Sequence, residues 1–311
     1  VYLAGNFASV NGQPRRNLAA VDATTGAATA WAPHTNRQMS AIAVSGGVLG
    51  VGGSYVSSIG GVARNNLAAL DIASGAATAW NPDVALSSPY KGVYALAVSG
   101  TTTYIGGGFE SVGGQARRNI AAVETATGNV TAWNPDAAGD VYAIAVSGNT
   151  VYAGGSFGNI GGQSREALAA LDAVTGAATN WLPSLVSANS VRAIVVSSGV
   201  VYVGGAFYRE GIGKGVVAVD ENTGLVIWDA NIHGSTGVFS LGGHALALSG
   251  STLYVGGYFQ SIGGEERKGL AALDASTGQA NAWNPGLTLP VEYGPWATGL
   301  AVVGNTVYVA G

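Results

Sequence analysis

An arginine recurs in five segments of this 311-residue sequence, each time shortly after a Gly-rich stretch: Arg15, Arg64, Arg117, Arg165 and Arg267. The guanidinium of arginine is a planar fork of donors that suits carboxylates and also bridges backbone carbonyls. Two roles are therefore open. The arginines could clamp loop carbonyls or loop acids such as Asp83, Asp136 and Asp140, or they could form a ring of positive charge that binds an anionic or sugar ligand.

Three aromatic residues lie in the connections between one repeated unit and the next, which vary most in length along the chain: Tyr90, Tyr293 and Trp296. Variable loops on a rigid scaffold are where recognition usually takes place. Aromatic faces beside arginines suit a glycan, so these aromatics and the recurring arginines form our candidate ligand site. The alternative is that the same side chains only cover the middle of the fold.

Catalytic chemistry is poorly supported by the sequence. The three histidines, His34, His233 and His244, do not recur, and there is no cysteine. Thiolate catalysis, disulfides and cysteine-based zinc sites are therefore excluded, and we expect neither a metal nor a cofactor. No nucleophile-elbow, zinc-protease, phosphate-loop or EF-hand pattern occurs. We predict a protein that is not an enzyme; the alternative is a carbohydrate-active lyase or hydrolase.

One repeated unit spans the whole chain. Copies begin near Val1, Leu49, Thr103, Val151, Val201 and Leu253, and a partial copy begins at Val307. A fixed period of this size indicates a repeat architecture. Each copy holds short apolar runs bounded by Gly, Asn, Asp and Ser, which are typical of β-strands. We therefore predict a single all-β domain over residues 1–311.

Four strands are expected in each unit, and their order can be followed in the fourth copy. An inner run, Ala143–Val146, precedes a strand at Val151–Gly155 that ends in a Gly-Gly pair. The next strand, Leu168–Asp172, is apolar on both faces, so it must be buried on both. The last strand ends at Trp181, an aromatic that recurs once per unit and is expected to anchor packing.

Other landmarks recur with these strands. We expect the Gly-Gly pair to mark a close approach, and the aromatic two residues after it to fill the gap between units, as at Tyr55 and Phe157. The Asp of the Asp-x-x-x-Gly turns, for example Asp172, is expected to cap its own turn. Reading these acids as calcium ligands is the alternative, but they lack the dense ligand spacing of a calcium loop.

The sequence resembles two known families at these residues. Ala170, Asp172, Thr175 and Gly176 with Trp181 beyond them resemble the tryptophan-docking motif of quinoprotein propellers. The landmarks VYxGGxF, IGG, LAALD, TG and WNP resemble the delta-60 repeat propellers of bacterial extracellular proteins. Both resemblances imply a β-propeller. Quinoprotein activity would also need a cysteine pair, so this activity and its cofactor are not expected here.

The predicted fold is thus a β-propeller of four-stranded antiparallel blades. We expect six blades, with seven as the alternative, and a ring closed by pairing Gly299–Val303 with the first segment. The surplus strand Val307–Gly311 repeats Val1–Gly5 and competes for the same place. Closing the ring would remove open sheet edges.

Composition bounds the partners. The net charge is -4 with 10% charged residues, so nothing indicates a nucleic-acid partner, and no apolar run is long enough to span a membrane. A chain that begins without Met in mid-repeat suggests a processed or excised fragment. We predict an extracellular or cell-surface binding or structural module whose partner is a polysaccharide or a surface protein. A subunit of a larger surface assembly is the other alternative.

Overall fold

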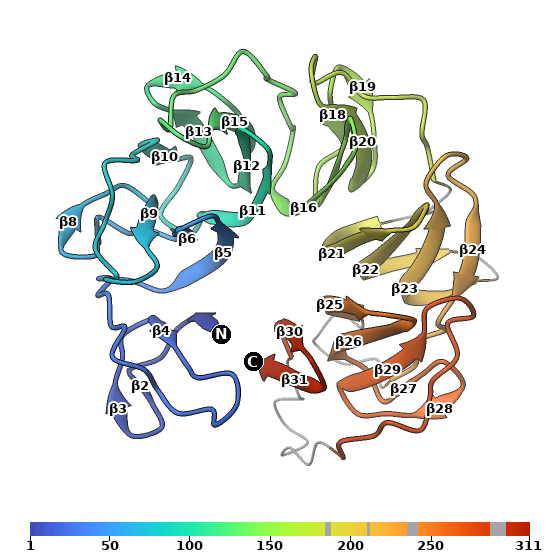
Figure 1. Cartoon of the computed structure of the whole chain (residues 1–311). Helices are drawn as coiled ribbons and strands as arrows, with labels where there is room; N and C mark the ends of the chain where they lie inside the picture. Colours follow the sequence, from blue (N-terminus) through green and yellow to red (C-terminus); the bar gives the residue numbers. More distant parts are fainter. Residues whose placement is uncertain (184–187, 210–211, 235–241, 287–296) are drawn as a thin grey trace.

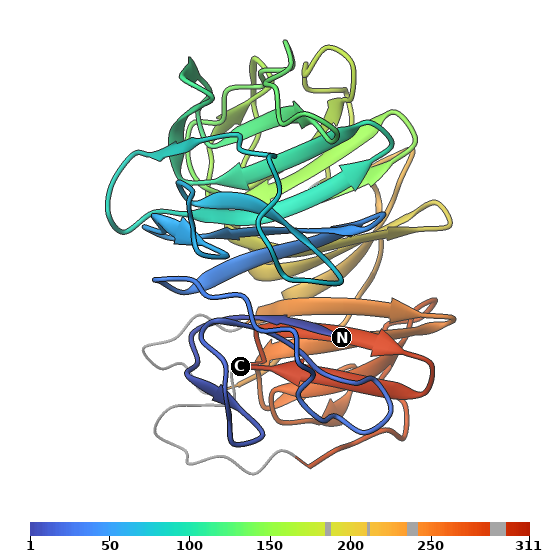
Figure 2. The ribbon, with the colours of Figure 1, turned by 60° about the vertical axis from the view of Figure 1, so that its left-hand side comes forward.

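The computed structural model describes residues 1–183, 188–209, 212–234, 242–286 and 297–311, and within these residues it contains strands and turns but no helix. The strands form small antiparallel sheets arranged around a central axis (Figure 1). Turned by 60°, the molecule shows the sheets of neighbouring repeats stacked face to face (Figure 2). The chain is therefore a β-propeller, as the repeat predicts.

The main strands fall into three sets, according to their order from the axis outward (Figure 1). The strands nearest the axis are β5 (Met39–Ser45), β11 (Val93–Ser99), β16 (Val141–Ser147), β21 (Ala188–Ser197), β25 (Gly242–Ser249) and β30 (Gly299–Val303). The second strands are β1 (Tyr2–Ala4), β6 (Val48–Gly53), β12 (Thr102–Gly107), β17 (Thr150–Gly155), β22 (Val200–Arg209), β26 (Thr252–Tyr258) and β31 (Thr306–Ala310). The third strands are β4 (Leu18–Ala20), β9 (Leu67–Asp71), β15 (Ile120–Glu124), β20 (Leu168–Asp172), β23 (Ile212–Asp220) and β29 (Leu270–Asp274).

We number the sheets along the chain. Sheet 1 is β1-β4, sheet 2 is β5-β6-β9, sheet 3 is β11-β12-β15, sheet 4 is β16-β17-β20, sheet 5 is β21-β22-β23-β24 and sheet 6 is β25-β26-β29. The strands β30 and β31 form a separate terminal hairpin. The pairings within these sheets are antiparallel, as between β16, β17 and β20.

The fourth, outer strand is mostly much shorter than predicted. Only sheet 5 has a regular one, β24 (Val226–Asp229), among the described residues. In the other sheets the outer segment makes a single bridge to the third strand, as Leu171 does with Ala178, before the chain reaches the Trp. The predicted fourth strand is therefore a regular strand in sheet 5 and a segment with one bridge in the other sheets.

Most connections between the second and third strands form small hairpins at the rim of the ring (Figure 1). The pairs are β2 (Ser9–Val10) with β3 (Gln13–Pro14), β7 (Ser58–Ile59) with β8 (Val62–Ala63), β13 (Phe109–Val112) with β14 (Gln115–Ala116), β18 (Asn159–Ile160) with β19 (Gln163–Ser164), and β27 (Ser261–Ile262) with β28 (Glu265–Glu266). The strand β10 (Val84–Leu86) adds to β13. The IGG landmark is the turn of these hairpins: Gly161 and Gly162 both have positive φ, 61° and 77°, as a tight hairpin turn requires.

The hydrophobic core lies between the sheets. Successive residues of β20 alternate between two clusters: Ala169 and Leu171 pack with sheet 3 side chains, whereas Leu168 and Ala170 pack with sheet 5 side chains. All four are at most 2% exposed. The predicted burial of this strand on both faces is confirmed, and it explains why the strand has no polar alternation.

A tryptophan joins each of sheets 1 to 5 to the next sheet. The indole N–H of Trp133 donates to the backbone carbonyl of Asp172 in the following sheet at 3.0 Å, and Trp181 bonds Asp220 in the same way. Trp133 is 4% exposed and meets Tyr104 edge-on, with ring centroids 5.1 Å apart. The predicted anchoring role is confirmed.

The Gly-Gly pairs stand where backbone and side chains come close. A Cβ on Gly154 would lie 2.4 Å from a methyl of Val191 in the next sheet, and one on Gly155 would lie 2.0 Å from the carbonyl oxygen of Asp140. Neither distance is compatible with a real side chain. The first glycine therefore sets the spacing between sheets, and the second sets the spacing within one.

One aromatic expected between the sheets is elsewhere. Phe109 and Phe157 are buried as predicted, at 1% and 2% exposure, but Tyr55 is 58% exposed. Val56, at 2% exposure, fills the space instead and makes the backbone hydrogen bonds that Phe109 makes in sheet 3. The reason is a one-residue insertion: eight positions separate Gly52 from Gly60, against seven in the other copies.

The two ends of the chain lie side by side (Figure 1), where the hydroxyl of Tyr308 donates to the carbonyl of Ala23. The predicted pairing of β30 with the first segment is not among the described pairings. Instead β31 takes the place beside β30, and β1 pairs with β4. A hairpin closed by a short turn loses less chain entropy than a pairing between distant segments. Six as the number of blades stays a prediction.

The Asp turns are capped as predicted. Asp172 accepts hydrogen bonds from the backbone N–H and the hydroxyl of Thr175, at 2.7 and 2.8 Å. These bonds favour the charged carboxylate and lower the pKa of Asp172 below its ordinary value, and the same occurs at Asp22, Asp71, Asp220 and Asp274. No group of three or more metal-ligating side chains occurs among the described residues.

The capped turns predict an acid-sensitive fold. A carboxylate whose pKa is lowered by folding stabilises the folded state fully above its unfolded pKa of about 3.9, and this contribution disappears as the pH falls through the folded pKa. The free energy of unfolding should therefore decrease as the pH is lowered below about 4. Asp172→Asn should show a smaller decrease than the parent chain between pH 5 and pH 2 in urea titrations; an identical pH profile would contradict the capping role.

The close approach of Gly154 predicts a matched pair of variants. Gly154→Ala should lower the free energy of unfolding by about 1–3 kcal/mol, because the new methyl overlaps Val191. Gly158→Ala should leave it unchanged or raise it by up to about 1 kcal/mol, since no atom lies within 4 Å of a Cβ there. Urea denaturation measures both, and equal values for the two variants would contradict the spacing role.

Candidate functional site

Each of the five recurring arginines joins two segments of its own blade. In sheet 3 the two terminal nitrogens of Arg117 donate to the carbonyls of Ala116 and Thr131, at 2.8 and 2.7 Å. The same pair of bonds, to the preceding carbonyl and to a carbonyl 14 residues ahead, is made by Arg15, Arg64, Arg165 and Arg267. The rim hairpin is thereby tied to the outer segment of its own sheet.

Sheet 5 shows what the arginine replaces. Its shorter loop offers Arg209 and Lys214 but no arginine at the recurring position, and there the outer segment is the regular strand β24, with Ala218 opposite Trp228. In the sheets that contain the arginine, its guanidinium donates to a backbone carbonyl of the outer segment, and the outer segment pairs with the third strand through one bridge only. These contacts match the clamping alternative; a ligand role for the five arginines stays a prediction.

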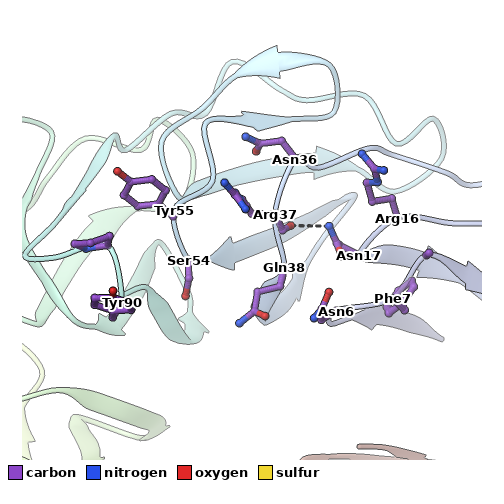
Figure 3. A pocket seen from close by; sticks show the side chains of 12 residues that line it. Asn6, Phe7, Arg16, Asn17, Asn36, Arg37, Gln38, Ser54, Tyr55 and Tyr90 are labelled. Atoms are coloured by element: carbon purple, nitrogen blue, oxygen red, sulfur yellow. Dashed lines mark hydrogen bonds between the residues drawn. The ribbon is translucent and has the colours of Figure 1, made fainter.

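A cavity of about 830 Å³ opens on the side of the long loops, between sheets 1 and 2. Figure 3 shows the labelled side chains that line it, which come from the loops of both sheets and from the loop that leads into sheet 3. The predicted ligand residue Tyr90 stands at its edge and is 91% exposed. The other predicted aromatics, Tyr293 and Trp296, lie outside the described residues.

Tyr55 adds a second aromatic that sequence reasoning had placed in the core. It is the extra residue of the sheet 2 loop, its φ is 58°, and it lines the same cavity as Tyr90 (Figure 3). A bulky side chain rarely has positive φ, and such conformations concentrate at functional sites. The longer interval between Gly52 and Gly60 is the signal that could have found it.

Arg16 and Arg37 give the cavity its charge, and neither was predicted. Both are exposed and line the cavity, and no acidic side chain is among its lining residues. The counterpart of Arg16 in sheet 3 is Arg118, whose Nε lies 3.6 Å from Asp136. In the first repeat His34 stands where Asp136 stands, so Arg16 has no ion pair in the described part of the chain. The cavity is positive in a protein of net charge -4.

The cavity walls are held by hydrogen bonds. The side-chain amide of buried Asn17 donates to the carbonyl of Arg37 at 2.8 Å, and the Thr35 hydroxyl donates to the same carbonyl at 2.7 Å. Asn36 bridges to the next sheet by donating to the hydroxyl of Ser57 at 2.9 Å. The backbone that carries Arg37 is thereby fixed, whereas its guanidinium stays exposed to solvent.

The arginine clamp predicts a contrast between two neighbouring residues. Arg117→Gln should lower the free energy of unfolding by about 1.5–3 kcal/mol, because it removes a charged hydrogen bond to the partly buried carbonyl of Thr131 and a second one to the exposed carbonyl of Ala116. Arg118→Gln removes only an exposed ion pair and should cost at most about 1 kcal/mol. Chemical denaturation measures both, and a stable Arg117→Gln protein would contradict the clamp.

Comparison with known proteins places the chain among propellers. Two solved structures resemble it: the WD40 β-propeller domain of Doa1, with 12% identity and TM-score 0.57 over 88% of this chain and 75% of that one, and the computationally designed Ika8 protein, with 19% identity and TM-score 0.52 over 87% and 67%. BamB from Moraxella catarrhalis is 20% identical, with TM-score 0.46 over 94% and 72%. No curated protein matches the sequence.

In the part of the chain that the structure describes, no helix has the length and apolar character needed to cross a membrane.

The family model PQQ_2, described as outer membrane protein assembly factor BamB, matches residues 63–310. This match covers more than half of the sequence. The chain therefore belongs to the PQQ_2, BamB-like family of repeat propellers.

Proposed function

We propose that this propeller is a non-catalytic binding module outside the cell, and that it holds a glycan in the cavity between sheets 1 and 2. The observation that carries the proposal is the meeting of Tyr55 and Tyr90 with two arginines that no acid neutralises there. Aromatic faces with polar tips suit sugar rings, and a guanidinium fork suits an acidic substituent.

Amide side chains complete the set. Asn6 and Gln38 are exposed at the cavity and form no hydrogen bond with the described residues. Each amide offers two donors and an acceptor, which matches the alternating donors and acceptors of sugar hydroxyls. The cavity is thus supplied with stacking faces, neutral hydrogen-bonding groups and positive charge.

Binding is preferred to catalysis because of what lines the cavity. Glycosidic bond cleavage uses paired carboxylates, and general acid–base catalysis uses groups that titrate near neutrality. The lining residues supply arginines, amides and tyrosines instead. The alternative of a lyase or hydrolase would therefore need its acid and base from another part of the chain.

Two finer assignments accompany this proposal. The landmarks VYxGGxF, IGG, LAALD, TG and WNP support assignment of the repeat to the delta-60 type, and with it the extracellular or cell-surface location. The family description names an assembly factor, so a surface protein bound at the same loops, or a place in a surface assembly, is the alternative that the experiment separates.

The test is a glycan array followed by calorimetry with the best oligosaccharide. We expect acidic glycans to bind better than neutral ones. Arg37→Gln should weaken binding about tenfold or more, since one charged hydrogen bond is worth about 1.5–3 kcal/mol. Tyr55→Ala and Tyr90→Ala should also weaken binding, because each removes an aromatic face from the sugar ring.

Arg118→Gln is the matched control, because it removes an exposed arginine outside the cavity. It should bind like the parent chain. An array without any retained glycan, or equal affinity in the cavity variants and the control, would overturn the glycan proposal. Turnover of any polysaccharide by the parent chain would overturn the non-catalytic one.

A further inference from the structure

One position on the strands nearest the axis departs from the repeat. It lies one residue before the small residue of each inner strand and is occupied in turn by Ser40, Tyr94, Tyr142, Arg192, His244 and Thr298. The flanking positions are Val, Ala and Gly in most copies. Four neighbouring sheets, 3 to 6, thus carry Tyr, Tyr, Arg and His at the same register, which we call the axial row.

The members of the axial row contact one another from sheet to sheet. The rings of Tyr94 and Tyr142 have centroids 5.5 Å apart, and the guanidinium carbon of Arg192 lies 5.1 Å from the centroid of Tyr142. Tyr94, Tyr142 and Arg192, on three neighbouring inner strands, therefore form one cluster around the axis. His244 is the next member of the row, and the charge of Arg192 contributes, after burial, to lowering its pKa.

The side chain of Tyr142 is held in place by a hydrogen bond to a buried carboxylate. Its hydroxyl donates to Oδ2 of Asp140 at 3.2 Å, and the same oxygen accepts from Nζ of Lys91 at 2.5 Å. Asp140 is only 9% exposed. Because Lys91 already neutralises this carboxylate, the charge of Arg192 has no acid matched to it in the described residues.

Arg192 itself is arranged to receive a ligand. The guanidinium carbon lies over the ring of Tyr142, and this contact uses none of the five N–H donors of the group as a hydrogen bond to a protein acceptor. Arg192 is exposed and forms no hydrogen bond or ion pair with the described residues. Burial, and secondarily Arg192, lower the pKa of His244 to about 4, so this imidazole is neutral at pH 7.

We propose that the axial row is a second binding site, which takes the carboxylate of an acidic sugar. Arg192 pairs with the carboxylate, and Tyr142 supports Arg192 through its ring. Tyr94 faces the sugar ring, and His244 borders the charged end. The hydroxyl of Tyr94 donates to the carbonyl of Tyr90 at 3.4 Å, so the site adjoins the cavity of sheets 1 and 2. It does not depend on that cavity being occupied.

The histidines allow a direct test by NMR. The chain contains only His34, His233 and His244, and their ring signals can be assigned with single His→Gln variants. A trimer of glucuronic acid is titrated at pH 7 into the full chain. We expect the His244 signals to shift on binding, and Arg192→Gln to weaken the affinity measured from this shift at least tenfold.

Arg192→Lys keeps the charge but loses the planar fork, so its affinity should fall between the parent and Arg192→Gln. Arg118→Gln serves as the control and should titrate like the parent. A glucose trimer should leave the His244 signals unchanged. His34 lines a neighbouring cavity of about 470 Å³ that shares Arg16 and Asn36 with the cavity of sheets 1 and 2, so its signals indicate binding near that cavity and not at the axial row.

Three outcomes would overturn the proposal. His244 signals that do not respond to the acidic trimer would exclude the site. If Arg192→Gln binds the acidic trimer with the same affinity as the parent chain, measured from the His244 shift, the guanidinium has no role in binding. An equal response to acetate alone would mean that the row takes any small carboxylate, and the assignment to an acidic sugar would be wrong.

Discussion

The whole molecule depends on burying both faces of small apolar sheets against one another. A strand such as β20 sends Ala169 and Leu171 into one core and Leu168 and Ala170 into the next, so neither face can be left in water. Burying a leucine side chain contributes about 1.5–3 kcal/mol, and each sheet obtains this only from its neighbours. The glycines at positions like Gly154 allow the close approach that this contact requires.

This constraint leaves little room for function within the repeat. Tryptophans, glycine pairs, turn aspartates and recurring arginines all have contacts inside the framework. A binding site has to be sought where a copy departs from the others. The departures found here are the inserted Tyr55, His34 in place of an acid, and the axial row. They lie in the loops or at single positions of the inner strands whose side chains are not part of the buried cores.

The sequence could predict what recurs, because a recurring residue reports a contact made by every copy. The burial of Leu168–Asp172 on both faces, the tryptophan anchor and the capped turn at Asp172 were all accessible in this way. The exposed position of Tyr55 was not predicted, because this residue is an aromatic like its counterparts in the other copies. Only the longer interval from Gly52 to Gly60 indicates the insertion. The outer strands are short where Arg117 or its equivalent donates to a carbonyl of the outer segment. The sequence shows the arginine, but only the structure shows which carbonyl accepts this bond. The axial row was missed because variation at one register position carries no periodic signal, and only the ring arrangement brings Tyr142, Arg192 and His244 together.

The two proposed sites share one loop, and this has a physical consequence. Residues Pro89 and Tyr90 border the cavity, Lys91 neutralises Asp140 behind the axial row, and the carbonyl of Tyr90 accepts from Tyr94. A long acidic chain that reaches from Tyr90 to Arg192 would lose its translational freedom once and use both sites, so its second contact benefits from a high effective concentration. Positive charge from Arg16, Arg37 and Arg192 on a molecule of net charge -4 would also direct such a chain to this side of the ring. Recognition by this propeller should therefore depend on the length of the acidic chain as well as on its charge.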